Sequence, residues 1–133
     1  FRRVICGSPS YIQGAGAPRE PEDLLNHACL RYGRESQTGW ELFNGEQRKV
    51  VAVQGPMVSN NGEMLRDAAV AGLGLILLPE FIVAPALASG DLMTVLDEWQ
   101  PSSLNLNALY PQHRQRSEVN RVFMAFLQEK LAG

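Results

Sequence analysis

VSNNGEMLRDAAVAGLGLILLPEF, from Val58 to Phe81, indicates a strand, a capped helix, a glycine turn and a buried strand in direct succession. Asn60 is the predicted N-cap of the helix, and Glu63 at the third helical position would complete a capping box. Gly72 supplies the left-handed residue that ends a helix. The predicted apolar face of this helix consists of Met64, Leu65, Ala68, Ala69 and Ala71.

The aliphatic run Leu73–Leu78 follows this helix and ends at Pro79. Such runs are typical of strands that are buried on both faces of a parallel sheet. In open α/β sheets, ligands bind outside the carboxyl ends of strands and against helix N-termini. Asn60–Asn61 and Pro79–Phe81 therefore stand where a pocket would form, although a purely structural αβ unit explains the same pattern equally well.

The composition favours one globular domain that does not itself bind DNA. The chain has 133 residues, of which 45% are hydrophobic and 20% charged, and its net charge is −2. Its basic residues are scattered, whereas a nucleic-acid surface is net positive and clustered. The longest apolar run is too short to cross a bilayer.

The two cysteines and the first residues indicate what kind of protein the chain comes from. Cys6 and Cys29 lack a CxxC spacing and are predicted to be reduced core thiols, which points to a cytoplasmic protein. The chain begins at Phe1 in what reads as the middle of a strand. We therefore expect it to be a piece of a longer protein.

The remaining pattern alternates short strands and helices, which predicts an α/β fold class. Ser8 is a predicted N-cap with Pro9 in the first turn, and Asn44–Gly45 suits a tight hairpin turn. Pro85 requires a helix that either starts late, with Ala84 as its cap, or is kinked. The predicted strands are Phe1–Cys6, Cys29–Tyr32, Trp40–Phe43, Gln47–Val53, Leu92–Leu96 and Leu104–Tyr110. The predicted helices are a short one after Ser8, Glu20–His27 with Leu24 and Leu25 facing inward, Phe81–Ser89, and one from Ser117 to Leu131; Glu98–Ser103 is a predicted loop.

No motif for catalysis, metal or a cofactor stands out. His27 and His113 have no Cys, Asp or Glu at ligand spacing. Ser8 is not in a Gly-x-Ser-x-Gly elbow. Gly72-Leu-Gly74 leads into a strand, whereas a dinucleotide loop must enter a helix. Trp40 and Trp99 are predicted to be packing residues.

Several phrases of the sequence, in this order, resemble the effector-binding domain of LysR-type transcriptional regulators. They are GSPSYI, PEDLLNHACL, NGEMLRDAAVAGLG, LLPEF, ALYP and VFMAFL, which lie between Gly7 and Leu127, and the resemblance in order and spacing spans Arg3 to Leu131. The resemblance implies a fold similar to type 2 periplasmic binding proteins, with a small-molecule effector between two lobes. It also implies that residues 4–103 are lobe II and that residues 104–131 return to lobe I as its C-terminal strand and helix.

The same resemblance implies that further domains lie outside this sequence and that the protein pairs with copies of itself. The N-terminal winged helix-turn-helix and the first part of lobe I would be absent, so DNA would be bound only through that absent domain. Effector domains of this family pair antiparallel, which implies a homodimer or homotetramer. The helix from Asn61 to Gly72 would contribute to that interface.

By position, six residues would be lobe II's share of the effector site: Ser8, Ser10, Asn60, Asn61, Pro79 and Phe81. Two helix N-termini would favour a carboxylate or a similar anion, and Phe81 would give an apolar wall. The alternative for Ser8 and Asn60 is that each only caps its own helix. A stand-alone solute-binding protein is a second functional hypothesis. A small hydrolase that uses Ser8 or Cys6 as nucleophile is a third, and it lacks a base at a recognisable spacing.

Overall fold

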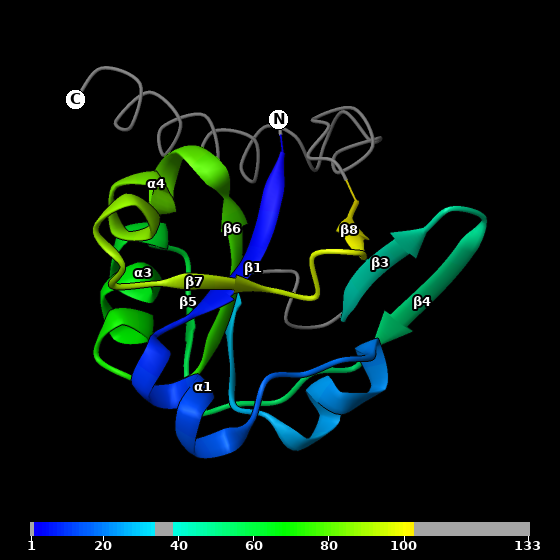
Figure 1. Cartoon of the computed structure of the whole chain (residues 1–133), viewed down its shortest axis with the longest axis horizontal. Helices are drawn as coiled ribbons and strands as arrows, with labels where there is room; N and C mark the ends of the chain where they lie inside the picture. The colour runs from blue at the N-terminus through cyan, green and yellow to red at the C-terminus, as the bar shows by residue number, and fades with distance from the viewer. Residues whose placement is uncertain (1, 34–38, 103–133) are drawn as a thin grey trace. The chain divides into compact units, whose positions relative to one another are not determined.

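A five-stranded mixed sheet forms the centre of the described unit (Figure 1). The computed structural model describes residues 2–33 and 39–102, and Arg2–Ser102 form one compact unit. The predicted strand Leu104–Tyr110 and the predicted helix from Ser117 to Leu131 lie outside the described residues. In spatial order the strands are β5 (Val58–Ser59), β2 (Cys29–Tyr32), β6 (Leu75–Pro79), β1 (Arg3–Gly7) and β7 (Met93–Val95).

Strand β6 lies near the middle of this sheet, and all five of its residues are buried. It pairs in parallel with β2 and antiparallel with β1. The expectation of a buried strand is therefore confirmed, but Leu73 is 46% exposed and precedes the strand, and the expected parallel environment holds on one side only. An aliphatic run indicates that both faces of a strand are covered. It does not indicate whether the neighbouring strands are parallel or antiparallel.

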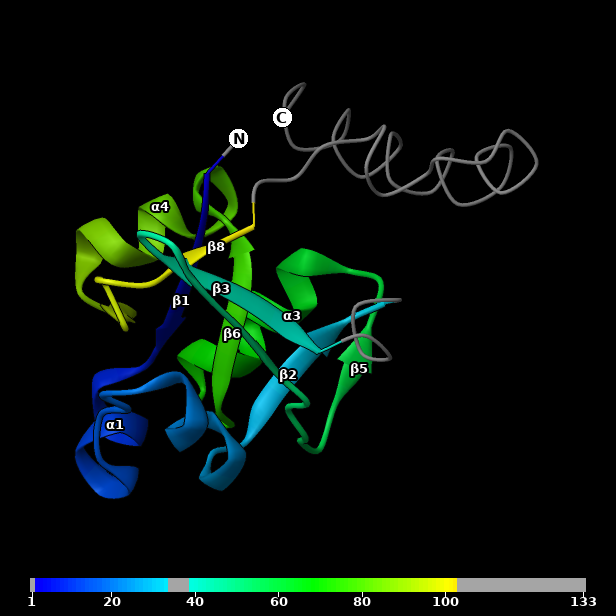
Figure 2. The same cartoon turned by 90° about the vertical axis from the view of Figure 1, so that its right-hand side faces the viewer.

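The helical elements are α1 (Pro9–Ala15), the 3-10 helix η1 (Pro21–Asn26), α3 (Gly62–Val70) and α4 (Glu80–Ser89). Helices α3 and α4 cover one face of the sheet, and a hairpin covers the other together with residues of α1 and η1 (Figures 1 and 2). Helices α3 and α4 lie side by side, and Arg66 donates from Nη1 to the carbonyl oxygen of Ile82 at 3.4 Å. On the hairpin side, the buried cluster includes Ile5, Leu75 and Leu77 of the sheet together with Trp40, Leu42 and Trp99. Both tryptophans are packing residues, as predicted.

The hairpin belongs to a second, three-stranded sheet of β4 (Gln47–Val51), β3 (Trp40–Asn44) and β8 (Gln100–Pro101). Asn44 pairs with Gln47, so the two turn residues are Gly45, with φ of +62°, and Glu46. The predicted hairpin is confirmed, with the turn one residue later than Asn44–Gly45. The predicted loop Glu98–Ser103 contains β8, which a local pattern misses because β8 exists only by pairing with β3.

Helix α3 starts one residue later than predicted. Asn61, not Asn60, is the N-cap, because Asn61 Oδ1 accepts from the backbone N–H groups of Glu63 at 3.0 Å and Met64 at 3.1 Å. Glu63 is then the second helical residue, so the predicted capping box does not form. The predicted end is confirmed: Gly72 has φ of +92°, and its N–H donates to Ala69 while that of Leu73 donates to Ala68.

Two predictions about inward-facing residues were wrong, and one of the two alternatives for the helix that contains Pro85 is excluded. Met64 is 52% exposed and Ala71 is also exposed, because the buried side of α3 is the one that carries Leu65 and Ala69. Leu25 is 60% exposed, whereas Leu24 is fully buried, because η1 is a single short 3-10 segment with one inward side. Helix α4 starts at Glu80 and contains Pro85 in its interior, so the late start at Ala84 is wrong.

The cap of α3 gives a test with a matched control. Replacing Asn61 with Ala should lower the free energy of unfolding by about 1 kcal/mol, because two backbone donors lose their acceptor. Replacing the adjacent Asn60 with Ala should change it by less than about 0.5 kcal/mol. Urea unfolding of both variants measures the difference, and a larger loss for the Asn60 variant would show that the cap is misplaced.

Two glycines give a second test with opposite expected signs. A Cβ on Gly74 would lie 2.3 Å from the carbonyl oxygen of Ala28, so Gly74→Ala should destabilise the protein by more than about 1 kcal/mol. Gly14 lies inside α1 with nothing within 4 Å of the position that its Cβ would occupy, so Gly14→Ala should stabilise by about 0.5 kcal/mol. Thermal unfolding measures whether each substitution lowers or raises Tm. A stabilising Gly74→Ala would contradict the close approach of Gly74 to Ala28.

Candidate functional site

The strand registers divide the six predicted site residues between two opposite edges of the central sheet. Arg3 pairs with Pro79 at one end of the β1–β6 pair, and Ser8 follows β1 at the other end. Helix α3 runs from one edge to the other. Asn61 is its N-cap at the first edge, and its last turn leads to Gly72, which lies beside Ser8 and Ser10 at the second. Figure 2 shows α1, which Ser8 begins, at the end of β6 opposite its arrowhead.

Asn60, Asn61, Pro79 and Phe81 belong to the edge at the carboxyl end of β6. Strands β2, β5 and β6 are parallel, so β2 and β5 end at this edge as well. Asn60 follows β5, and its Oδ1 occupies the space beside Gly33, where a Cβ would lie only 2.5 Å away. Gly33 has φ of +41°. Glycine at this position lets the Asn60 side chain lie against the end of β2.

Pro79 and Phe81 lie where β6 passes directly into α4. Pro79 is buried and is the N-cap of α4, so that helix starts without a side-chain cap. The first backbone N–H, of Glu80, donates to the carbonyl oxygen of Arg2 at 2.9 Å. The Glu80 carboxylate also lies 3.8 Å from the Arg2 guanidinium. Phe81 is half-buried beside this junction.

Ser8 and Ser10 lie at the other edge, and their hydroxyl groups are already engaged. Ser8 is 3% exposed, and its Oγ accepts from the backbone N–H of Tyr11 at 3.1 Å. The two hydroxyl oxygens are 3.2 Å apart. Ser8 is thus the N-cap of α1, as predicted, with Pro9 in the first turn. The length of β6 separates this pair from Asn60 and Pro79, so the predicted contacts form two groups at different edges.

Arg2 and Arg3 lie near the edge that contains Asn60 and Pro79, which we call the site edge. The sequence analysis counted both arginines only among the scattered basic residues. Arg3 is 5% exposed and donates from Nε to the carbonyl oxygen of Ser102 at 3.1 Å and from Nη2 to Ser102 Oγ at 3.0 Å. These bonds join the first and the last parts of the described unit. A local pattern does not reveal this contact, because 99 positions separate the two residues.

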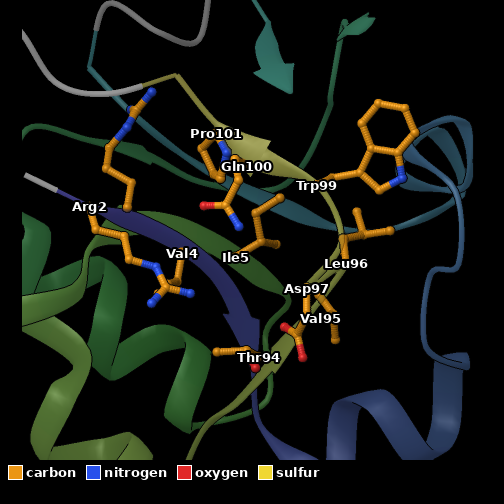
Figure 3. Close-up of a pocket in the computed structure, with 11 residues that line it drawn as sticks. Arg2, Val4, Ile5, Thr94, Val95, Leu96, Asp97, Trp99, Gln100 and Pro101 are labelled. Atoms are coloured by element: carbon orange, nitrogen blue, oxygen red, sulfur yellow. The ribbon is translucent and has the colours of Figure 1, made fainter. Parts of the chain in front are cut away.

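Figure 3 shows a hollow between β1 and the β7–β8 segment, beside Arg2 and Arg3. Its lining includes Val4, Asp97 and Gln100. The volume is about 20 Å³, which is room for about one water molecule. Pockets for small organic ligands start at about 300 Å³. This hollow is therefore too small to hold an organic effector by itself.

Burial suppresses the ionisation of several titratable groups inside the unit. It raises the pKa of the Cys6 thiol and of the Cys29 thiol to about 12, so neither is a reactive thiolate near neutral pH. Both are free and buried, as predicted. Burial lowers the pKa of His27, whose Nδ1 lies 2.8 Å from the Tyr11 hydroxyl, and that hydroxyl accepts from the N–H of Ala28.

The described residues offer neither a metal cluster nor a membrane-spanning helix. Across residues 2–33 and 39–102, no three His, Cys, Asp or Glu side chains gather closely enough to hold a metal ion. Within those ranges, no helix combines the length and the apolar character needed to cross a membrane. His113 lies outside the described residues.

Known proteins with similar sequences are transcription regulators. The chain is 38% identical over 128 residues to the HTH-type transcriptional activator TtdR of Escherichia coli K12, a match that covers 95% of this chain and 41% of TtdR. It is 36% identical to the HTH-type transcriptional regulator YhjC of the same strain, over 93% of this chain and 42% of YhjC. The chain thus spans about two fifths of the length of these relatives.

Solved structures with a similar fold come from transcription regulators as well. The regulatory domain of AphB from Vibrio vulnificus matches with a TM-score of 0.69 and 26% identity, over 76% of this chain and 50% of that one. CrgA, a LysR-type transcriptional regulator from Neisseria meningitidis, matches with a TM-score of 0.64 and 26% identity, over 99% of this chain and 45% of CrgA. The α/β fold described above is therefore that of LysR-type regulatory domains.

The family model described as the LysR substrate binding domain matches residues 1–132. This match extends over nearly the whole chain and agrees with the sequence relatives and with the fold. The chain belongs to the LysR substrate-binding domain family.

Proposed function

We propose that this chain is the effector-sensing part of a LysR-type transcriptional regulator. Family membership carries the proposal, and the site edge supports it, because the parallel strands β2, β5 and β6 all end there. Ligands of open α/β sheets bind at such edges. Residues 4–103 would be lobe II, residues 104–131 would return to lobe I, and the effector would bind between the lobes.

Asn60, Asn61, Pro79 and Phe81 would be lobe II's contacts with the effector. The Asn60 side chain is exposed and does not cap α3, so its amide is available to a ligand. Helix α4 lacks a side-chain cap, and its positive dipole end favours an anion such as a carboxylate. Asn61 Oδ1 is already used by its own helix, so that residue would contribute through its exposed amide group. Ser8 and Ser10 remain predicted contacts, and their position requires a separate test.

In the full-length protein, effector binding would change transcription by shifting the equilibrium between two lobe arrangements. Only a difference in affinity for the two arrangements can supply the free energy for that shift. DNA would be bound by an N-terminal winged helix-turn-helix domain, and the regulator would act as a cytoplasmic homodimer or homotetramer. The relatives TtdR and YhjC, which are named as HTH-type regulators, support the helix-turn-helix part of this proposal.

The hydrolase hypothesis receives no support from the position of Ser8. A nucleophilic serine needs an adjacent general base and an accessible hydroxyl. Ser8 is buried, and within the described part of the chain its hydroxyl contacts the Tyr11 N–H and the Ser10 hydroxyl. Neither partner is a general base. Hydrolysis of model esters that disappeared on Ser8→Ala would overturn the choice of a non-catalytic sensor.

A thermal-shift screen of the intact effector domain with small aromatic and aliphatic acids tests the site. A true effector at about 100 times its Kd should add about 2.7 kcal/mol of stability and so raise Tm. Asn60→Ala should raise the Kd of that effector roughly fivefold, because one hydrogen bond is lost. The matched control is Asn26→Ala, an exposed asparagine of η1 outside the predicted site, which should leave the Kd unchanged, while Ser10→Ala separately tests the predicted contacts at the opposite edge.

Two results would contradict this assignment. If Ser10→Ala weakens binding while substitutions at Asn60 and Phe81 do not, the effector binds at the other edge. If no acid stabilises the domain, the proposed ligand class is wrong. The sequence upstream of Phe1 separates the sensor from a stand-alone solute-binding protein, because a helix-turn-helix supports the first and a secretory leader supports the second.

A further inference from the structure

The sequence contains two Asn-Gly pairs, Asn44–Gly45 and Asn61–Gly62, and the structure places them in opposite chemical situations. In an Asn-Gly pair the glycine nitrogen can attack the asparagine side-chain carbonyl carbon, because glycine has no Cβ to block the approach. Whether this happens in a folded protein depends on how freely the asparagine side chain moves. The two pairs therefore form an internal comparison.

Asn44 lies at the tip of the β3–β4 hairpin with an unrestrained side chain. It is exposed, and its amide group makes no hydrogen bond with the described part of the chain. Gly45 is also exposed, and nothing lies within 4 Å of the position that its Cβ would occupy. The side chain of Asn44 can therefore rotate toward the Gly45 nitrogen without displacing a neighbour.

Asn61 is held at three points. Its Oδ1 accepts from the N–H groups of Glu63 and Met64, and its own backbone N–H donates to Ser59 Oγ at 3.0 Å. Gly62 is buried at the first position of α3. Both side-chain hydrogen bonds must open before the Asn61 carbonyl carbon can turn toward the Gly62 nitrogen.

We propose that Asn44 is a site of spontaneous deamidation to isoaspartate in the folded protein, and that the helix cap protects Asn61 from the same reaction. In the first step the Gly45 nitrogen bonds to Asn44 Cγ, the Cγ–Nδ2 bond breaks, and ammonia leaves with the proton of the Gly45 N–H. Water then opens the succinimide. Opening at the Asn44 backbone carbonyl gives isoaspartate, and opening at Cγ gives aspartate.

The product would alter the hairpin at a defined place. Isoaspartate routes the backbone through the side chain and adds one carbon atom to it, so the pairing of Asn44 with Gln47 could not persist. Either product also adds one negative charge to the hairpin. The modified protein is then separable from the original by charge.

Incubation of the full-length protein in heavy-oxygen water at mildly alkaline pH, followed by peptide mass spectrometry, tests the proposal. Heavy oxygen and isoaspartate should accumulate at Asn44, with Asn61 reacting roughly tenfold more slowly because its two hydrogen bonds must open first. In concentrated urea both sites should react at similar rates. Asn44→Gln should remove the signal, because the longer side chain does not form the five-membered ring.

Each other result has a defined meaning. Equal rates at the two sites in the folded protein would show that the cap gives no protection. Reaction at Asn44 in urea but not in the folded protein would show that the hairpin turn is itself too rigid for attack. Either result overturns the proposal, and neither depends on the effector or on DNA binding.

Discussion

Burial of β6 on both faces is the constraint on which the rest of the described unit depends. Its residues Leu75–Leu78 are at most 4% exposed, and they contact the hairpin side and the helix side of the sheet at once. A strand of this kind needs a hydrogen-bonded neighbour on each side and a covering layer on each face. Strands β1 and β2 are the two neighbours, the hairpin covers one face, and helices α3 and α4 cover the other.

The direction of the strands beside β6 decides which of the predicted site residues lie at the same edge. Because β2 and β5 run parallel to β6, three strand ends meet at one edge, next to Asn60 and Pro79. Because β1 runs antiparallel to β6, its end and the cap residue Ser8 lie at the opposite edge. The same antiparallel pairing brings Arg2 and Arg3, at the start of β1, to the site edge, where the first contacts Glu80 and the second Ser102.

Local sequence patterns predicted helix ends and buried strands well. Ser8 with Pro9, Gly72 and the run up to Leu78 depend on contacts within a few residues, and the structure confirms them. The position of the α3 cap was one residue off, because Asn60 and Asn61 are chemically identical and only the helix start distinguishes them. Exposed Met64 and Leu25 were placed inside because apolar character does not report which neighbours are present.

The family was indicated by the resemblance of several sequence segments to known members. The α/β class and most helices and strands could be predicted from local patterns, because capping, glycine turns and aliphatic runs act over short distances. Which candidate residues share an edge could not be predicted in this way. That outcome depends on strand direction and register, and these are set by contacts between residues far apart in the chain, such as Arg3 with Pro79 and Arg3 with Ser102.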